Sequence, residues 1–301
     1  MTILLSFYFE IFFNQHIVGR NGQGGSLNQL SHPNQIIYVA DSWNHRIMEW
    51  RSNTSNGRIV AGGNRQGNRL DQLNHPTDVI IDRENNSLII ADRDNRRVMR
   101  WSCEKSERGQ IIISDIDCYG LAMHEDGSLY VSDTKKNEVR RWKKGETQGT
   151  LVSGGNGEGS RLNQLHYPTF LFVDNNHSLY VSDAHNYRVI KWIEGAKEGV
   201  VVAGGNGQGD RTTQVALPHG VVVDQFGQIY VADWVNNRVM RWCEGEKEGL
   251  IVIGGHGKGQ HANQLNTPGS VLLDDEENLY VVDYWNHRIQ KFEIEETKKK
   301  S

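Results

Sequence analysis

The sequence is short of cysteine and proline, and each scarcity excludes a class of protein. Three cysteines occur in 301 residues, and no CxxC spacing joins any two of them. A disulfide-stabilised scaffold or a cysteine-based zinc site is therefore not expected. The three cysteines are instead expected to be free thiols in a reducing setting. With five prolines and 37% hydrophobic residues, the composition fits neither a collagen-like nor a disordered chain. The cysteines are Cys103, Cys118 and Cys243.

Net positive charge and long apolar runs are also missing. The formal net charge is −4, so the chain lacks the basic footprint of a non-specific nucleic-acid binder. No apolar run reaches the roughly 20 residues of a membrane-spanning helix, and no membrane partner is expected. The apolar start, MTILLSFYFEIFF, is interrupted by Glu10. It is interpreted as an extra strand or an atypical start, with a degenerate signal peptide left open. The cytoplasm is favoured, and secretion stays open.

A repeat of about 50 residues runs through the chain. Its most regular part is a YVAD-like string followed by a tight polar turn and an apolar string that ends in an aromatic residue. Four short runs in each repeat are rich in Val, Ile, Tyr and Trp, which is typical of strands. In the fifth repeat they are His219–Asp224, Ile229–Asp233, Arg238–Cys243 and Leu250–Gly254. The sequence therefore predicts an all-β, six-bladed β-propeller of four-stranded antiparallel blades. The six strings begin at Tyr38, Ile89, Tyr130, Tyr180, Tyr230 and Tyr280.

The two ends of the chain indicate how the ring closes. The last repeat stops after its third strand, while His16–Gly24 (HIVGRNGQG) matches Val201–Gly209 (VVAGGNGQG). An N-terminal strand is therefore expected to complete blade 6, which removes an exposed edge. One propeller domain is expected over residues 16–294, after an apolar segment at 1–15 and before a charged tail at 295–301.

Two repeats depart from the pattern. Blade 3 is shorter by about one loop, because Asp92 and Asp133 are closer in sequence than the corresponding residues of the other blades. Between Pro33 and Tyr38, blade 1 has no counterpart of the first strand. Blade 1 is therefore expected to lack its inner strand and to leave a gap at its inner edge.

The strings NHRI at Asn44 and Asn286, preceded by YVAD and YVVD, resemble the NHL-repeat family. The likeness extends from about His16 to Ile294 and implies a six-bladed propeller. That family includes RNA binders, protein-binding scaffolds, sensor domains and a few lyases, so the resemblance leaves the function open, and function must be argued from sites.

Residues that recur in every blade are interpreted as structural. An aspartate at the end of the second strand is followed in five blades by Asn three residues later and Arg five residues later, a set suited to fixing a turn. The aromatic residue at the end of the third strand is expected to fill the wedge between blades. The glycine-rich loops, such as GGNGQG at Gly204, lack the βαβ setting of a dinucleotide site.

Residues that differ between blades are the candidates for a site. The turn after each aspartate faces the surface where propellers usually bind ligands. Trp43, Trp234, Tyr284 and Trp285 are predicted to form an aromatic arc over blades 5, 6 and 1, and His185 in the turn of blade 4 is a further candidate. Arg93, Arg96, Lys135 and Lys136 are predicted to form a cationic arc over blades 2 and 3. The expected function is a non-catalytic scaffold that binds an unidentified protein or small ligand through its loop face, as a monomer and without a cofactor.

Two alternatives stay open. The first is a metal-dependent lyase or hydrolase, for which His219 is the one good ligand among the residues that follow the Pro of the inner strands. Because a metal site needs several converging ligands, no catalytic residue and no metal site are assigned. The second alternative is binding of single-stranded RNA along the cationic arc.

Overall fold

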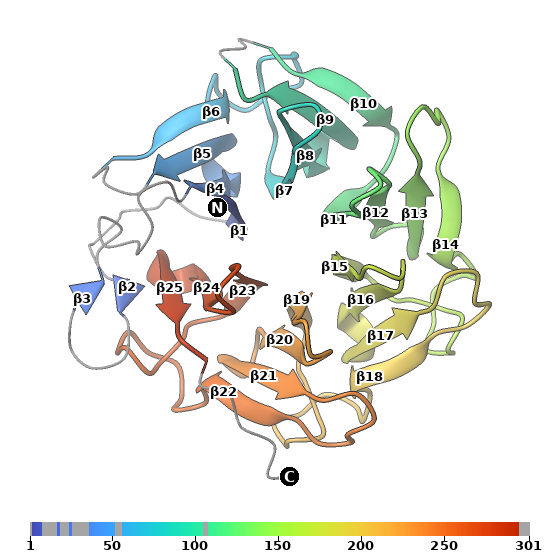
Figure 1. The fold of residues 1–301 in the computed structure, drawn as a ribbon, viewed down its shortest axis with the longest axis vertical. Helices are drawn as coiled ribbons and strands as arrows, with labels where there is room; N and C mark the ends of the chain where they lie inside the picture. The colour runs from blue at the N-terminus through green and yellow to red at the C-terminus, as the bar shows by residue number, and fades with distance from the viewer. Residues whose placement is uncertain are drawn as a thin grey trace.

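A computed structural model describes residues 2–7, 17–18, 24–25, 36–51, 56–104 and 108–294. Six sheets stand around a central axis like the blades of a propeller (Figure 1). The chain passes from one blade to the next in sequence order. The all-β, six-bladed fold that the repeat predicts is therefore confirmed.

Blades 2 to 5 are four-stranded, and neighbouring strands within each blade are antiparallel. Blade 2 contains β7 (Pro76–Asp82), β8 (Ser87–Asp92), β9 (Arg97–Ser102) and β10 (Gln110–Ser114). Blade 3 contains β11 (Cys118–Met123), β12 (Leu129–Asp133), β13 (Glu138–Trp142) and β14 (Thr150–Gly154). Blade 4 contains β15 (Pro168–Val173), β16 (Leu179–Asp183), β17 (Arg188–Trp192) and β18 (Val200–Gly204). Blade 5 contains β19 (Pro218–Val223), β20 (Ile229–Asp233), β21 (Arg238–Trp242) and β22 (Leu250–Gly254).

The repeats of blades 1 and 6 supply three strands each. Blade 1 has β4 (Ile36–Asp41), β5 (Arg46–Arg51) and β6 (Arg58–Gly62), and blade 6 has β23 (Pro268–Leu273), β24 (Leu279–Asp283) and β25 (Arg288–Phe292). The short strand β2 (Ile17–Val18), from the segment expected to complete blade 6, lies against β25. Among the described residues, however, β2 pairs with β3 (Gly24–Gly25) in a separate ribbon.

The repeat of blade 1 lacks an inner strand of its own, as predicted, but the expected gap is absent because another segment covers its inner edge. The strand β1 (Thr2–Phe7) pairs with β4 along its whole length, from Thr2 beside Ile36 to Phe7 beside Asp41. The pairing is parallel, whereas the inner strands of blades 2 to 6 run antiparallel to their second strands. The free N–H and C=O groups along β4 need partners, and a strand of either direction can provide them. Residues 2–7 of the apolar start thus form an extra strand, one of the interpretations that the sequence allowed.

The shortening of blade 3 is confirmed. About 13 residues separate the outer strand of one blade from the inner strand of the next at most crossovers, as between Gly204 and Pro218. Between β10, which ends at Ser114, and β11, which starts at Cys118, there are three. The missing residues belong to the crossover loop, and the strands of blade 3 keep their full length.

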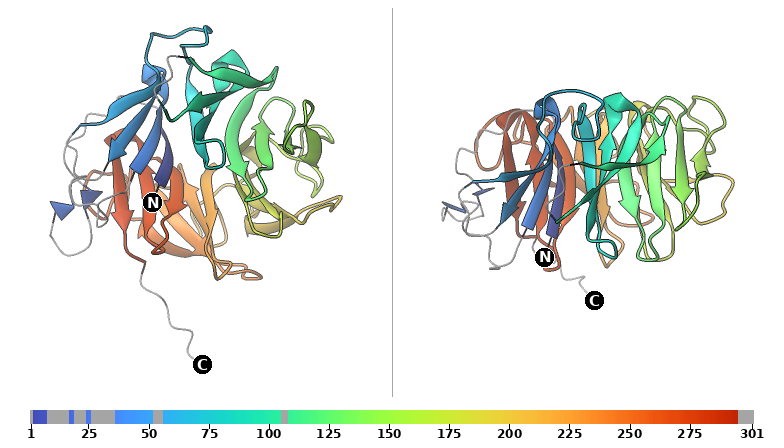
Figure 2. Two further views of the ribbon diagram at one scale, coloured as in Figure 1. Left: turned by 45° about the horizontal axis from the view of Figure 1, so that its top comes forward. Right: turned by 90° about the horizontal axis from the view of Figure 1, so that it is seen from above.

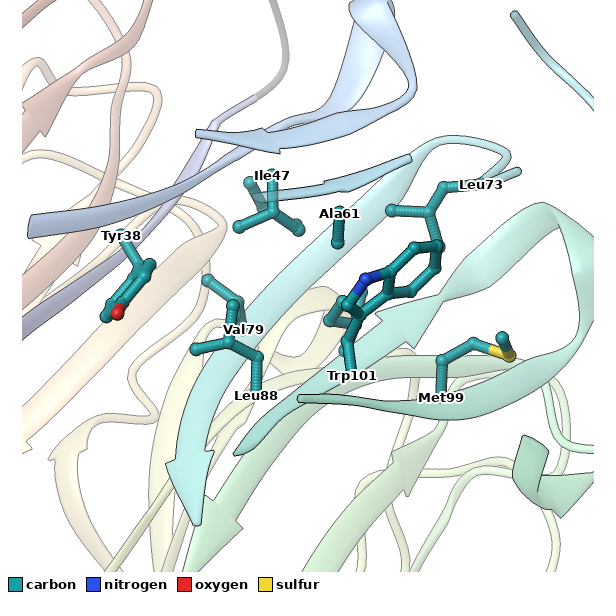
Figure 3. Packing of buried hydrophobic residues seen from close by; sticks show 10 residues of the cluster. Tyr38, Ile47, Ala61, Leu73, Val79, Leu88, Met99 and Trp101 are labelled. Atoms are coloured by element: carbon teal, nitrogen blue, oxygen red, sulfur yellow. The ribbon is translucent and has the colours of Figure 1, made fainter. Parts of the chain in front are cut away.

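Side chains of adjacent blades share the hydrophobic cores. Figure 3 shows the core between blades 1 and 2, where Tyr38 and Ile47 meet Val79, Leu88 and Trp101. The repeated aromatic residue is almost fully buried in four blades and partly buried in blades 3 and 6. Its predicted role as a filler between blades is therefore confirmed. The six residues are Trp50, Trp101, Trp142, Trp192, Trp242 and Phe292.

The strands run between the two faces of the disc (Figure 2). The turns that join second to third strands lie beside the crossovers, because each inner strand starts where its second strand ends, as Pro168 does beside Asp183. This end is called the loop face. The turns that join first to second strands lie at the other end, called the opposite face.

The repeated Asp–Asn–Arg set fixes the loop face. In blade 4, Asp183 accepts hydrogen bonds from Asn186 and Arg188, each at 2.7 Å. Arg188 also donates to the backbone carbonyls of Ser160, Arg161 and Gln164 in the crossover loop. The same set occurs in blades 2, 5 and 6 with the same kind of partners. The structural interpretation of the repeat is therefore confirmed: each set ties a turn to the preceding crossover.

Each 3-10 turn that the structure describes holds three residues. No helix in the described ranges is long and apolar enough to cross a bilayer.

Candidate functional site

Each turn of the loop face exposes one residue to solvent and buries its neighbour wholly or partly. The second residue after the repeated aspartate is exposed in all six blades. The first residue is buried or half-buried in all six, because it packs beneath the turn. Among the predicted site residues, Trp43, Lys135, His185 and Trp285 occupy the exposed position. Arg93, Trp234 and Tyr284 occupy the inner one.

Aromatic rings form a connected series around the axis at the loop face, called here the aromatic series. His219 stacks on Trp234 with ring centroids 4.3 Å apart, and Trp234 contacts Tyr284 at 4.8 Å. Tyr284 meets Trp285 edge to face at 5.3 Å. On the other side, the ring of Tyr119 lies 6.1 Å from that of His219. The rings of Tyr167 and Phe170 both contact that of Tyr119, and His185 stacks on Tyr167. These three residues complete the series.

This series runs over blades 3 to 6, whereas the predicted arc ran over blades 5, 6 and 1. Trp234, Tyr284 and Trp285 are brought together as expected. The ring of Trp43 packs edge to face on His75 at 5.1 Å, and His75 in turn contacts His45. The contact with His75 thus links Trp43 to the crossover that leads into blade 2.

Exposure rises from the inside of the aromatic series to its rim. Tyr119, Phe170 and Tyr284 are buried, and Tyr284 is only 6% exposed. His219 and Trp234 are half-buried. The rim consists of Tyr167, His185 and Trp285, with Tyr167 36% and Trp285 44% exposed. A buried base under an exposed rim suits a binding surface, because the base holds the rim residues in place.

Tyr167 and Phe170 were not predicted. Tyr167 directly precedes Pro168, the first residue of the inner strand β15, whereas the predicted site residues lie in the turns after the repeated aspartates. Tyr167 has a left-handed φ of 57°, and its N–H donates to Asn137 Oδ1 at 2.8 Å. The residue before the proline has a similar φ at Leu217 and Thr267. The position directly before the repeated proline was therefore the sequence signal that could have identified Tyr167 as a site residue.

The histidines of the aromatic series are neutral near pH 7. Burial lowers the pKa of His219 to about 3, and the nearby His185 adds to the effect. The pKa of His185 is also lowered, by burial first and then by His166. In the described ranges, the ring nitrogens of His219 have no hydrogen-bond partner. The centre of the site is thus apolar and uncharged, with one imidazole available to a ligand.

The predicted cationic arc is largely neutralised by acidic residues. Arg93 pairs with Asp94 at 2.7 Å. Arg96 pairs with Asp115 at 2.7 Å and with Asp117 at 3.2 Å. Lys136 lies 3.8 Å from the carboxylate of Asp133. These acids reduce the attraction for a phosphate backbone. The geometry therefore gives the RNA alternative little support.

A metal site around His219 also finds little support. The rings described around it belong to Tyr119, Phe170 and Trp234, none of which is a usual zinc ligand. His75 and His166 lie just before the first prolines of the inner strands of blades 2 and 4, and their rings contact other histidines. His32, the matching residue of blade 1, lies outside the described residues. In the described part of the chain, the one group of three metal-ligating side chains is on the opposite face.

The fold and the shared contacts of its repeats define the class of protein: a six-bladed β-propeller, here with a series of aromatic rings on its loop face. The model of the NHL repeat matches residues 216–241 and 265–292. The match therefore covers blades 5 and 6 of this six-bladed β-propeller.

Several solved structures share the fold at low identity. An auxiliary nutrient binding protein from Bacteroides thetaiotaomicron is 14% identical with a TM-score of 0.65, over 84% of this chain and 64% of that one. This chain thus spans less than two thirds of that protein. Virginiamycin B lyase from Staphylococcus aureus is 12% identical with a TM-score of 0.55, over 88% and 82% of the two chains. A chain of a nidogen/laminin complex is 16% identical with a TM-score of 0.61, over 84% of this chain and 87% of that one. No curated protein matches the sequence.

Proposed function

We propose that this protein is a non-catalytic binding scaffold whose loop face holds a ligand or a protein segment with a planar, uncharged group. The observation that supports this most is the aromatic series, which ends in the exposed rim of Tyr167, His185 and Trp285 over a buried base. Aromatic residues on a rigid support bury large areas at low entropic cost, and they dominate binding energies at interfaces.

The electrostatics of the series indicate the class of ligand. His219 and His185 have lowered pKa values and are neutral near pH 7. The site thus offers π faces and imidazole nitrogens, and its centre holds no fixed charge. A ligand with an aromatic or aliphatic face and one hydrogen-bond donor for His219 fits this surface best.

The test uses affinity capture with quantitative mass spectrometry of the captured proteins and small molecules. A Trp234→Ala, Trp285→Ala double variant should lose the partner that the unmodified chain captures. Phe226→Ala is the matched control, because Phe226 is 64% exposed but lies in a turn of the opposite face. Equal capture by the double variant and the unmodified chain, with both folded, would rule out the aromatic series as the binding site.

A lyase is the second candidate, on two observations. The fold is shared with virginiamycin B lyase, and the imidazole of His219 makes no described hydrogen bond beside the axis. A base with a pKa of about 3 accepts few protons at neutral pH, which weakens the role of general base. Metal analysis of His219→Ala separates the two functions: a lyase with a metal at this site should lose the metal, and a scaffold should show no change.

A further inference from the structure

Two turns of the opposite face break the repeat with histidines. These turns join the first and second strands of blades 3 and 4. The first turn position is His124 in blade 3, and it is aspartate in blades 2, 4, 5 and 6. The fourth position is His177 in blade 4, and it is glycine in blades 3 and 5. The aspartates are Asp82, Asp174, Asp224 and Asp274, and the glycines are Gly127 and Gly227.

His177 stands where the backbone favours glycine. Its φ is 58°, against 81° and 77° at Gly127 and Gly227. A side chain in the left-handed region costs about 1–2 kcal/mol. Glu277 occupies the same position in blade 6 with a φ of 62°, so the turn accepts a side chain here but does not require a histidine.

The two histidines meet across the boundary between their blades. Their rings are stacked with centroids 3.6 Å apart. The carboxylate of Asp126 lies beside both: Oδ1 is 2.9 Å from His124 Nδ1, and Oδ2 is 3.7 Å from His177 Nε2. One ligand atom from each of the three residues lies within 4.8 Å of the others. In a tetrahedral site with bonds of about 2.0–2.1 Å, neighbouring ligand atoms are about 3.3 Å apart. Small side-chain rotations would thus bring the three around one ion.

The remaining ring nitrogens already have partners of the kind that orient metal-bound histidines. His177 Nδ1 lies 3.1 Å from the Tyr130 hydroxyl. His124 Nε2 lies 3.4 Å from the backbone carbonyl oxygen of Asn175. When these nitrogens carry the proton and donate it, the lone pairs of His177 Nε2 and His124 Nδ1 are left on the side of Asp126. Such outer partners fix the tautomer and the orientation of the rings.

We propose that His124, Asp126 and His177 form a transition-metal site of the Zn²⁺ class that joins blades 3 and 4. Two imidazoles and one carboxylate suit Zn²⁺, Co²⁺ and Ni²⁺, whereas Mg²⁺ and Ca²⁺ prefer oxygen ligands alone. Asp126 is exposed and the histidines are partly buried, so an ion can enter from solvent and water can complete its coordination. Arg141, which interacts with Tyr130 beside the site, is paired with Glu194 at 2.6 Å. This site is independent of the aromatic series, which lies on the other face.

A simpler arrangement of the same residues competes with the metal. The backbone N–H of Asp126 also points at His124 Nδ1, at 3.2 Å. His124 can therefore be held by Asp126 alone, with Nδ1 accepting from this N–H. A bound metal would replace both contacts at Nδ1, and only metal binding measured with the protein distinguishes the two arrangements.

The experiment titrates the chelator-treated full chain with Zn²⁺ by calorimetry and with Co²⁺ by visible absorption. One ion per chain is expected, together with a rise in the unfolding midpoint, because the ion binds the folded state. His177→Gly and His124→Asn should each weaken binding at least tenfold. His177→Gly should fold, because glycine occupies this position in two other blades. Tyr130→Phe should weaken binding about 10–100-fold, the usual effect of removing an outer partner.

The controls use another histidine pair. His166 and His185 also contact each other, with Nδ1 of His185 3.3 Å from Nε2 of His166, but they lie at the loop face. A His166→Ala, His185→Ala variant should keep the Zn²⁺ affinity. Loss of binding in that variant alone would overturn the proposal. So would the absence of Zn²⁺, Co²⁺ and Ni²⁺ binding by the unmodified chain, or binding unchanged in His177→Gly and His124→Asn.

Discussion

At the residue scale, His219 links the loop face to the pH dependence of folding. Its pKa is lowered to about 3 in the folded protein, from an ordinary value of 6.5. As the pH falls below 6.5, the unfolded chain binds the proton first, so the free energy of unfolding decreases. Between pH 7 and pH 5, His219 should cost about 1–2 kcal/mol of stability.

Urea unfolding of His219→Gln at the two pH values measures this contribution. The variant should lose less stability than the unmodified chain on going from pH 7 to pH 5. His261→Gln, at an exposed histidine, serves as the control and should follow the unmodified chain. Parallel behaviour of all three proteins would show that His219 titrates equally in the folded and unfolded states.

A second residue-scale prediction concerns the arginine of the repeat. Arg188 pairs with Asp183 and donates to three carbonyls of the crossover loop. Arg188→Ala leaves the buried carboxylate without its cation, which typically costs about 3–5 kcal/mol. Urea unfolding should show this loss, with Arg161→Ala, at an exposed arginine of the same loop, close to the unmodified chain. Arg188→Lys should also lose stability, because an ammonium cannot reproduce the planar fork.

At the element scale, the inner strands pack too closely for side chains at particular positions. A Cβ on Gly220 of β19 would lie 2.5 Å from the backbone nitrogen of Val271 in β23. Gly220→Ala should therefore push two blades apart and cost about 1–3 kcal/mol, the range for overpacked cores. Gly269→Ala is the control, since its Cβ would make only ordinary contacts of 3.4 Å or more. Equal unfolding midpoints of the two variants would contradict the close approach.

The elements show which features a sequence can predict. Strands that recur were predicted to within a residue, as in blade 5, because six copies of the same pattern reinforce one another. The reversed strand β1 was not predicted, because a short, mostly apolar run such as Thr2–Phe7 can pair with an open strand edge in either direction. The His124–Asp126–His177 group was also missed. Its signal was present as two departures from the repeated Asp and Gly of one turn, but only the fold shows that neighbouring blades bring them together.

At the scale of the whole molecule, β1 completes a ring of six inner strands. It contacts β7 of blade 2 on one side and β23 of blade 6 on the other, so the inner ring closes through it. A propeller without this closure is a curved array whose two end blades have an exposed face each. Ring closure should therefore make the six blades unfold together.

Replacing residues 2–7 with a Gly-Ser stretch of the same length tests this closure. The variant should unfold at a lower temperature, by about 2–4 °C for each kcal/mol lost, and over a broader transition, because blades 1 and 6 no longer support each other. Amide hydrogens of β4 should exchange faster. Because β4 needs mainly backbone partners, a second variant with Val-Thr-Val-Thr-Val-Thr at residues 2–7 should restore the midpoint and the protection. Equal midpoints and exchange in the Gly-Ser variant and the unmodified chain would mean that the ring closes without β1.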